Sequence, residues 1–547
     1  MTVKLTQKIR ETGRQIAAMV FEYGEQTCRS LAEQFDCSKS SVHRHKQARK
    51  KRDQHPESWF WETDEGYAWL HRCVFATIYK FGVQRSIGPG HLSEYFAMLR
   101  IGTHVGISES ALRTQIHVME NLIPAFQTMC EAQQAGTGTV RKVVVAGDET
   151  FFDSQVLLVL IELTSGYLLL EESADDRSYE TWLEKAQPRL EALDIEVIHA
   201  VTDRAKALVK LATDGFGCES GADVFHAIHE VSKALGAAHH CSVEKAKREA
   251  GASQIKLEKL QEKNAGKAEL EQAQRAVKQD TNRVSVREQG QKIYQKLQRG
   301  LSEIVHPFDV ENDAKQSSAQ AAKRLEEQVR KLKDNASLNH VEDRNGGLDK
   351  FRRQISAQTC GIDAWWVWVL ESLSDRVIGI EQKEWLMYSL LPVFYWYRQM
   401  EKSQNAHHRK RYKQAWQRAL AAYLTHSMTS TLSSEERKQW ETWADWMSGQ
   451  FHRSSSAVEG RNGCLSQMYH NGRGLTKRRL NALTVIHNYG IRRADGTTAA
   501  ERLFDTEFPD LFEWLLERME PLPLPRKGKS RVVSNPLNLQ LCPCLSG

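Results

Sequence analysis

The stretch RKVVVAGDET, residues 141–150, decides the fold because it joins an apolar strand to a pair of acids. Its β-branched run, Val143 to Val145, has the composition of a strand covered on both faces, and Gly147 marks the point where that strand stops. Asp148 is therefore expected at a sheet edge, where α/β proteins keep their chemistry. If further acids converge on that edge, they form a candidate site with Asp148.

The segments that follow predict a mixed sheet with helices. Two apolar runs separated by the turn TSG predict a hairpin of buried antiparallel strands, and a strand that leads into a helix comes after them. The predicted elements are a hairpin over 156–163 and 167–173, a helix over 178–194, a fourth strand over 195–203 and a further short strand over 222–229. The order is strand, strand, strand, helix, strand, which is an α/β pattern.

A second carboxylate stands where the fourth strand ends. Val197 and Val201 lead to Thr202 and Asp203, after which RAKALVKLA continues as a helix. If this strand lies parallel to the one that ends at Asp148, the two acids face each other at one sheet edge. Like charges at close range are costly, and a divalent cation bound by both is the common remedy. The alternative is that Asp203 only caps the helix that it precedes.

The third candidate acid lies in FHRSSSAVEGRNGCLSQMYHNGRGL, residues 451–475. Glu459 sits early in a predicted helix, with Arg461 and Asn462 beside it. The alternative is structural, because Ser456 to Glu459 has the S-x-x-E pattern of a capping box. A capping box leaves the basic surroundings unexplained, and a single acid among many cations suits a site that holds phosphate. These cations are Arg453, Arg461, Arg473, Lys477, Arg478 and Arg479.

Residues 27–52 have the layout of a helix-turn-helix. Leu31 and Phe35 give the first helix an apolar face, Asp36 lies in the turn, and Ser38 can cap a second helix. The second helix and its extension carry several cations and no acid, which predicts contact with DNA bases and phosphates. The alternative is a solvated basic helix that ends in a linker. The predicted DNA-contacting residues are Ser40, Ser41, His43, Arg44, Lys46, Arg49, Lys50, Lys51 and Arg52.

Three further regions are predicted to be helical. Residues 99–120 repeat the helix-turn-helix pattern with balanced charge, which fits a core-packing helical hairpin as well as a second DNA reader. Residues 242–340 are rich in Lys, Glu, Gln and Ala, and their apolar residues at helical spacing predict a solvated helical insertion or a partner-binding arm. The tryptophan-rich helices of 361–400 favour a packed core over a base-stacking platform.

Composition bounds the class of protein. A chain of 547 residues exceeds one ordinary core and favours several domains. The 75 Lys and Arg against 69 Asp and Glu give a formal net charge of +6, which leaves room for local basic patches. Ten cysteines without a CxxC pair predict reduced, intracellular thiols. The first residues lack an apolar signal region and no apolar run is long enough to span a bilayer, so we expect a soluble protein that is not exported.

Asp148, Asp203 and Glu459, in this order of elements and behind an N-terminal helix-turn-helix, resemble the catalytic acids of a DDE transposase of the prokaryotic insertion-sequence type. DVFHAIH, residues 223–229, is similar to the D-x-F-H strand that follows the second acid in several such families. The resemblance covers roughly residues 20–500 and rests on the joint order of short motifs. It implies a multidomain protein with an N-terminal all-α helix-turn-helix region and an α/β ribonuclease H-like core (mixed sheet), interrupted by a long α-helical insertion.

The resemblance also implies a chemistry. Asp148, Asp203 and Glu459 would hold two Mg²⁺ ions, for which Mn²⁺ would substitute, to cleave DNA at the element ends and transfer the strands into target DNA. The partners would be double-stranded DNA and a second copy in a homodimer or larger synaptic complex, without a membrane, in the prokaryotic cytoplasm at the nucleoid. Further candidates for contacting phosphate, orienting ligands or replacing one of the aspartates are Glu149, Arg204, Asp223, His226, Arg461 and Asn462.

Two other functions stay open: a DNA-binding protein without catalysis, as a regulator or an inactive transposase descendant, and a ribonuclease H-fold nuclease that cuts without joining. The three acids favour the enzyme, because a scaffold has no reason to keep three acids at a repulsive site. The predicted domains are a helix-turn-helix domain (1–75), a second helical domain (76–140), the first part of the core (141–241), the helical insertion (242–440), the final core helix with the third acid (441–500), and a C-terminal helix with a basic tail (501–547).

Overall fold

The computed structural model describes residues 12, 15–16, 26–52, 55, 60–61, 63–134, 138, 140–152, 155–343, 345–374, 376–472, 474–523 and 525. The basic tail predicted at the C-terminus lies outside these residues. The chain forms two compact units. The first, here called the sheet unit, comprises 129–467 and 487–508, and the second, the terminal unit, comprises 1–128, 468–486 and 509–547.

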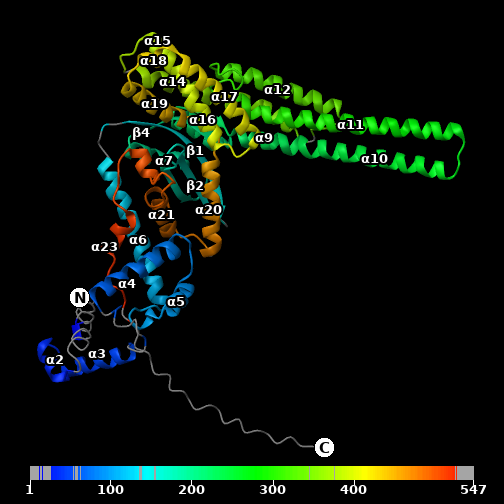
Figure 1. The fold of residues 1–547 in the computed structure, drawn as a ribbon. Coiled ribbons are helices and arrows are strands. Elements are labelled where there is room, and N and C mark those ends of the chain that lie inside the picture. The colour runs from blue at the N-terminus through cyan, green and yellow to red at the C-terminus, as the bar shows by residue number, and fades with distance from the viewer. Residues whose placement is uncertain are drawn as a thin grey trace, which may run out of the picture. The chain divides into compact units, whose positions relative to one another are not determined.

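Five strands form the sheet of the sheet unit (Figure 1). They are β1 (Arg141–Phe152), β2 (Gln155–Glu162), β3 (Leu168–Ala174), β4 (Ile195–Thr202) and β5 (Glu219–Ala222), in the order β3-β2-β1-β4-β5. β2 is antiparallel to β1 and β3, whereas β4 is parallel to β1 and β5 is parallel to β4. The predicted hairpin and the mixed sheet are therefore confirmed, and the apolar runs that predicted them are the buried centres of β1, β2 and β3.

Helices between and beside the strands cover the sheet. α7 (Tyr179–Ala192) connects β3 to β4 and buries Trp182 completely. The indole of Trp182 lies close to Gly147 of β1, where a Cβ would also come within 3.1 Å of Leu208. Gly147 thus leaves room for α7 and for α8 (Lys206–Lys210) to pack against the centre of the sheet. A π-helical turn at Leu211–Gly215 completes the connection from α8 to β5.

The strand predicted over 222–229 is wrong. β5 ends at Ala222, and α9 (Val224–Val231) begins two residues later. The Asp223 side chain accepts a hydrogen bond from the backbone N–H of His226 at 2.8 Å, which caps the first turn of this helix. A short apolar run fits a buried strand and a half-buried helix equally well, and here the cap favours the helix.

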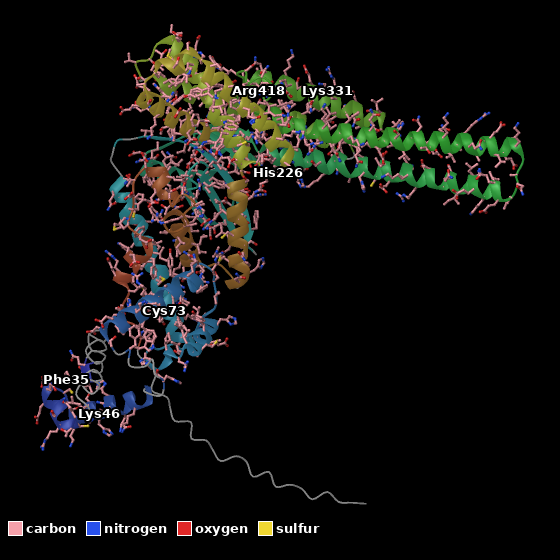
Figure 2. The ribbon with its side chains drawn as sticks, viewed as in Figure 1. Phe35, Lys46, Cys73, His226, Lys331 and Arg418 are labelled. Carbon is pink, nitrogen blue, oxygen red and sulfur yellow. The ribbon has the colours of Figure 1, made fainter. Side chains whose placement is uncertain are left out.

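The regular elements described between 242 and 440 are helices, joined by turns and loops, apart from an isolated bridge between Phe308 and Lys315. α10 and α11 pack along each other as a long arm, α12 packs on α11 (Figure 1), and exposed side chains cover the arm around Lys331 (Figure 2). The helices are α10 (Ala237–Glu262), α11 (Lys267–Ile304), α12 (Ser318–Leu338), α13 (Gly347–Arg353), α14 (Ile355–Ser374), α15 (Ile380–Trp385), α16 (Leu391–Lys402), α17 (Ala406–Thr425), α18 (Ser427–Thr431) and α19 (Ser434–Gly449), with π-helical turns at Ser232–Gly236 and Leu386–Leu390.

The tryptophans of α14 to α16 lie in a packed core, as predicted. Trp365 and Trp366 surround Phe308, and Trp396 stacks on Tyr412 of α17. Their side chains are buried. Although several of these helices are long, none in the described part of the chain is both long and apolar enough to cross a membrane.

The terminal unit contains the predicted helix-turn-helix. α2 (Cys28–Gln34) is capped by Thr27, whose Oγ1 accepts from the N–H of Ser30, and α3 (Lys39–Arg52) begins after Ser38, whose Oγ accepts from the N–H of Ser41. Leu31 and Val42 are completely buried between these helices and Ile16. The remaining helices of this unit are α4 (Asp64–Thr77), α5 (Pro89–Met98), α6 (Glu109–Gln134), α21 (Lys477–Val485) and α23 (Leu511–Arg518), with turns at Ile78–Val83 and Ile101–Thr103.

One acid of the charge-balanced segment 99–120 lies in the packed interior of the terminal unit. Glu120 of α6 is 1% exposed and accepts hydrogen bonds from Arg478 Nε at 2.8 Å and Arg479 Nε at 2.7 Å. Two of the cations that the sequence grouped in one basic cluster are therefore paired with a carboxylate within the terminal unit. Arg473 of that cluster lies outside the described residues.

Close packing of α14 on the sheet predicts a sharp effect of one methyl group. A Cβ on Gly361 would lie 2.9 Å from Nε2 of His199, a buried residue of β4. We expect Gly361→Ala to lower the free energy of unfolding by about 1–3 kcal/mol. Urea denaturation measures this change. The control is Gly251→Ala on α10, where nothing lies within 4 Å of the added Cβ and a gain of about 0.5–1 kcal/mol is expected. Equal effects of the two substitutions would contradict this packing.

Candidate active site

Asp148 lies inside β1, opposite Val159 of β2, so the prediction that this strand stops at Gly147 is wrong. Asp148 and Asp203 nevertheless stand level with each other at the end of β4. β1 and β4 pair in parallel, and Ala146 stands opposite Val201. Two residues further along both strands, the same register sets Asp148 opposite Asp203. This pairing depends on a register shift of one residue earlier in the strands, without which Thr202 would stand opposite Asp148.

The carboxyl group of Asp148 is half-buried, and its pKa is raised from 3.8 to about 6. Burial is the largest cause, and the negative charges of Asp203 and Glu459 raise the pKa further. Hydrogen bonds from the N–H of Glu149 to Oδ1 and from Asn462 Nδ2 to Oδ2, both 2.9 Å long, act in the opposite direction. The three acids singled out in the sequence therefore lie near enough to act on one another electrostatically.

Asp203 is exposed, and its Oδ1 accepts a hydrogen bond from the N–H of Ala205 at 2.9 Å. Helix α8 begins at Lys206 without a side-chain cap. The capping alternative requires Asp203 to accept a hydrogen bond from a backbone N–H in the first turn of α8. It therefore does not account for this carboxylate.

Glu459 lies on α20 (Ser456–Gly472), which a buried ion pair fixes to the sheet. Arg461 Nε and Nη2 donate to Glu171 Oε1 and Oε2 of β3 at 2.6 and 2.5 Å, and the two residues are 6% and 3% exposed. Burial alone would lower the pKa of Arg461, but the charge of Glu171 outweighs it and the pKa is raised. Because its guanidinium is committed to Glu171, Arg461 acts here as an anchor for the helix.

The buried face of α20 leaves Glu459 on the other side of the helix. Val458 and Leu465 are completely buried beside Arg461, whereas Glu459 is exposed. Ser456 is the first residue of the helix and not the residue before it. The capping-box alternative needs Ser456 in that preceding position, so it does not explain Glu459.

Asn462 connects α20 to Asp148 of β1. Its Nδ2 donates to Asp148 Oδ2, and its Oδ1 is buried without a hydrogen-bond partner in the described part of the chain. A buried amide oxygen without a partner costs free energy. This oxygen is therefore available as an acceptor, for a ligand hydroxyl or a cation, directly beside the acids.

Asp223 joins the two segments that carry the second and third acids. Its N–H donates to the carbonyl of Thr202, which precedes Asp203. Its Oδ2 accepts from the N–H and the Oγ of Ser455 at 2.6 and 2.8 Å, directly before α20. Asp223 is 4% exposed. Its carboxylate is thus used to hold the start of α20 against the end of β4, which is a positioning role and not the direct role that made Asp223 a rival of Asp203.

The other second-rank candidates lie around the same edge. Glu149 Oε1 accepts from Trp182 Nε1 at 3.3 Å, and Arg204 Nη1 donates to the carbonyl of Ser220 at 2.8 Å. The backbone of Arg204 is left-handed, with a φ of 73°. His226 is exposed on α9 (Figure 2). Of these residues, Glu149 interacts electrostatically with both aspartates.

The donor set fits a hard divalent cation. Asp148, Asp203, Glu459 and the Asn462 amide offer only oxygen atoms, which Mg²⁺ prefers, and the repulsion that raises the pKa of Asp148 is what a cation would relieve. Among the described residues, no three His, Cys, Asp or Glu side chains converge closely enough to hold a metal ion as they stand. The metal assignment stays a prediction.

The predicted DNA-contacting residues lie on α3 of the terminal unit. Ser40, His43, Arg44 and Lys50 are exposed, whereas Lys46 (Figure 2) is half-buried and donates to the carbonyl of Gln26 at 2.5 Å. The half-buried Ser41 donates its N–H to the Ser38 cap. The side chains of Arg49, Lys51 and Arg52 lie outside the described part of the structure.

Sequence reasoning missed two residues that build the site. Glu171 was visible only as part of the strand LLLEES, yet an acid inside an apolar strand is a signal that a buried cation faces it. Ser455 was one of three consecutive serines, and nothing in the sequence distinguishes it from Ser454 or Ser456.

Comparison with known proteins adds one match. Residues 386–531 match a family described as a family of unknown function (DUF6399). The matched segment includes the whole of α20, with Glu459 and Arg461. No curated protein and no solved structure matches the chain.

The buried ion pair predicts a large effect of removing one partner. Arg461→Met leaves the Glu171 carboxylate buried without its cation and should cost about 3–5 kcal/mol of stability, measured by urea denaturation. The double variant with Glu171→Leu should regain most of this loss, because two apolar residues replace both charges. Arg492→Met is the control, since Arg492 pairs with Glu501 at the surface and should cost less than about 1 kcal/mol. An Arg461→Met protein as stable as wild type would refute the anchoring role.

Repulsion among the acids predicts that neutralising one of them raises the stability of the protein by an amount that depends on pH. The raised pKa of Asp148 means that the folded state holds this proton more tightly than the unfolded state, so its contribution to stability falls as the pH rises from about 4 to about 6. We expect Asp203→Asn to lower that pKa and to melt at a higher temperature than wild type at pH 7.5 without divalent metal. The difference should shrink at pH 4.5. Thermal melting at the two pH values measures it, and a pH-independent difference would argue against charge repulsion.

Proposed function

We propose that this protein is a DDE transposase that binds the ends of its mobile element and catalyses metal-dependent DNA strand cleavage and strand transfer. The observation that carries the proposal is the effect of Asp203 and Glu459 on the pKa of Asp148, which joins three acids from distant parts of the chain at one sheet edge. Structural acids are normally paired with cations or caps, whereas perturbed carboxylates gathered at a sheet edge are typical of functional sites.

The fold supports the proposal through its topology. The strand order β3-β2-β1-β4-β5, with only β2 antiparallel to its neighbours, is what a ribonuclease H-like core would have. The first acid lies in the central strand β1, the second follows the strand parallel to it, and the third lies on a helix after a long helical insertion.

The chemistry would use the acids without a covalent protein intermediate. Divalent cations held by Asp148, Asp203 and Glu459 would supply activation of a water or a 3′-hydroxyl and stabilisation of the leaving oxygen. The protein's own residues prepare this arrangement. Asn462 orients one oxygen of Asp148, the Arg461 pair holds α20 against the sheet, and Asp223 holds the start of that helix beside Asp203.

DNA recognition would come from α3 of the terminal unit. This helix carries cations without an acid, and Ser40, His43 and Arg44 are exposed where a major-groove reader needs them. Two ends of an element must be held together for transfer, so the proposed working form is a homodimer or a larger synaptic complex.

A plasmid excision and integration assay tests the function. The donor carries a marker between the flanking sequences of the reading frame, and wild type should cut and join it only with Mg²⁺ or Mn²⁺. Asp148→Ala, Asp203→Asn and Glu459→Ala should each lower the yield by at least about a thousandfold, as expected when a group that acts only in the transition state is removed. Each variant should keep its affinity for the ends.

Asp334→Asn, which changes an exposed acid of α12, is the matched control and should keep full activity. Wild type that binds the ends but never cuts them under any divalent metal would overturn the enzyme in favour of a DNA-binding protein without catalysis. Cutting without joining would instead indicate a nuclease.

A further inference from the structure

Four cationic side chains and one neutral histidine of the sheet unit interact electrostatically and form what we call the basic cluster: Arg398, Lys402, His452, Arg453 and Arg493. Arg398 and Lys402 lie one turn apart at the end of α16, His452 and Arg453 lie in the segment between α19 and α20, and Arg493 follows the π-helical turn at 486–490. The sequence separation is large, so the fold and not local composition brings these cations together.

The turn between β2 and β3 holds two members of the basic cluster. His452 Nε2 lies 3.0 Å from Thr164 Oγ1, which itself donates to Gln450 Oε1 at 2.8 Å. Arg493 donates to the carbonyls of Thr164 and Ser165 at 3.3 and 3.0 Å. These partners are neutral, so they fix Arg493 without cancelling its positive charge, while His452 is held as a neutral imidazole.

The two other arginines are also held in place. Arg398 forms a two-bond contact with Asp445 at 2.8 and 2.6 Å, and Arg453 donates to the carbonyls of Ser302 and Val305. Of the contacts described for the basic cluster, only that of Arg398 is to a carboxylate. The cluster is therefore preorganised and keeps a net positive charge.

Lys402 and Arg493 are the exposed members of the basic cluster. The ammonium group of Lys402 has no hydrogen-bond or ion-pair partner in the described part of the chain, and the side chain is open to solvent. Desolvation, followed by the positive charges of Arg398, Arg493 and Arg453, lowers the pKa of Lys402. Burial and the charges of Lys402, Arg398 and Arg493, with His199, lower the pKa of His452 to about 3. Cations collected in this way cost free energy that a bound anion would recover.

We propose that the basic cluster binds a backbone phosphate of duplex DNA through the ammonium group of Lys402. This inference rests on the proposed function for the choice of ligand, since phosphate esters are the anions that the protein would meet. The position of the basic cluster in the chain supports DNA over a free ion. His452 lies three residues before Ser455, whose contact with Asp223 positions α20, the helix that carries Glu459. A duplex bound at the basic cluster would therefore be held by the segment that leads to the acids. Phosphate contacts of this kind position a duplex without reading its sequence.

Acetylation footprinting of the full chain tests the site directly. The lowered pKa of Lys402 leaves more of its amine uncharged at pH 7.5, so Lys402 should react readily with an acetylating reagent, and the exposed Lys410 of α17 serves as the reference. A duplex of random sequence should slow the acetylation of Lys402 several-fold and leave that of Lys410 unchanged, as read by mass spectrometry. Inorganic phosphate at equal phosphate concentration should protect Lys402 much less. Equal protection by inorganic phosphate would mean a site for the free ion, and no protection by either would overturn the proposal.

Salt dependence of DNA binding provides the second measurement. Lys402→Gln should reduce the slope of log K against log salt concentration by about one, whereas Lys410→Gln should leave it unchanged. An unchanged slope in Lys402→Gln would refute the phosphate contact, while the plasmid assay would still decide the proposed function. If wild type binds no DNA, the proposed function and the inference both fail. If it binds and recombines DNA without protecting Lys402, only the inference fails.

Discussion

The ion pair between Arg461 and Glu171 is the contact on which the site depends. It joins residues 290 positions apart in the chain and fixes α20 to β3, an edge strand of the sheet. The pair is desolvated, which makes it costly to form and far more costly to break on one side only. Since Arg461 lies between Val458 and Leu465 on one face of α20, its anchoring fixes the rotation of the helix. Because of that rotation, Asn462 contacts Asp148 of β1 and the charge of Glu459 acts on the same carboxylate.

Repulsion among the acids is a second constraint, and it opposes the attachment of α20 to the sheet. Asp148, Asp203 and Glu459 repel one another, and the raised pKa of Asp148 shows how far this repulsion and burial go. Such an arrangement lowers stability, so it needs rigid support. The support comes from neutral and paired contacts around the acids: the amide of Asn462, the N–H of Glu149 and the carboxylate of Asp223. A site built in this way keeps its charge for a ligand.

The sequence predicted those parts of the structure that depend on local patterns. Apolar runs of β1 to β4 predicted the mixed sheet, and the end of the run in β4 predicted the position of Asp203, whereas β1 continues past Asp148 to Phe152. The sequence could not predict that Asp203 stands opposite Asp148, because this depends on a register shift between β1 and β4 that composition does not reveal. Glu171 and Ser455 could not be assigned either, since their partners lie hundreds of residues away. α9 was predicted as part of a strand over 222–229 because a short, partly apolar segment does not distinguish the two structures without its cap.

The long insertion is compatible with a well-defined site because its two ends return to the same residue. Asp203 and Glu459 are 256 positions apart (459 minus 203), yet Asp223 contacts the carbonyl of Thr202 on one side and Ser455 on the other. Arg453 also donates to the carbonyls of Ser302 and Val305 at the end of α11, so this end of the arm contacts the segment that leads into α20. The distance between the second and third acids is therefore set by one buried carboxylate and not by the helices between them. The arm can change in length without moving the acids, while a shift of its base, transmitted through Arg453 and Ser455, would move Glu459.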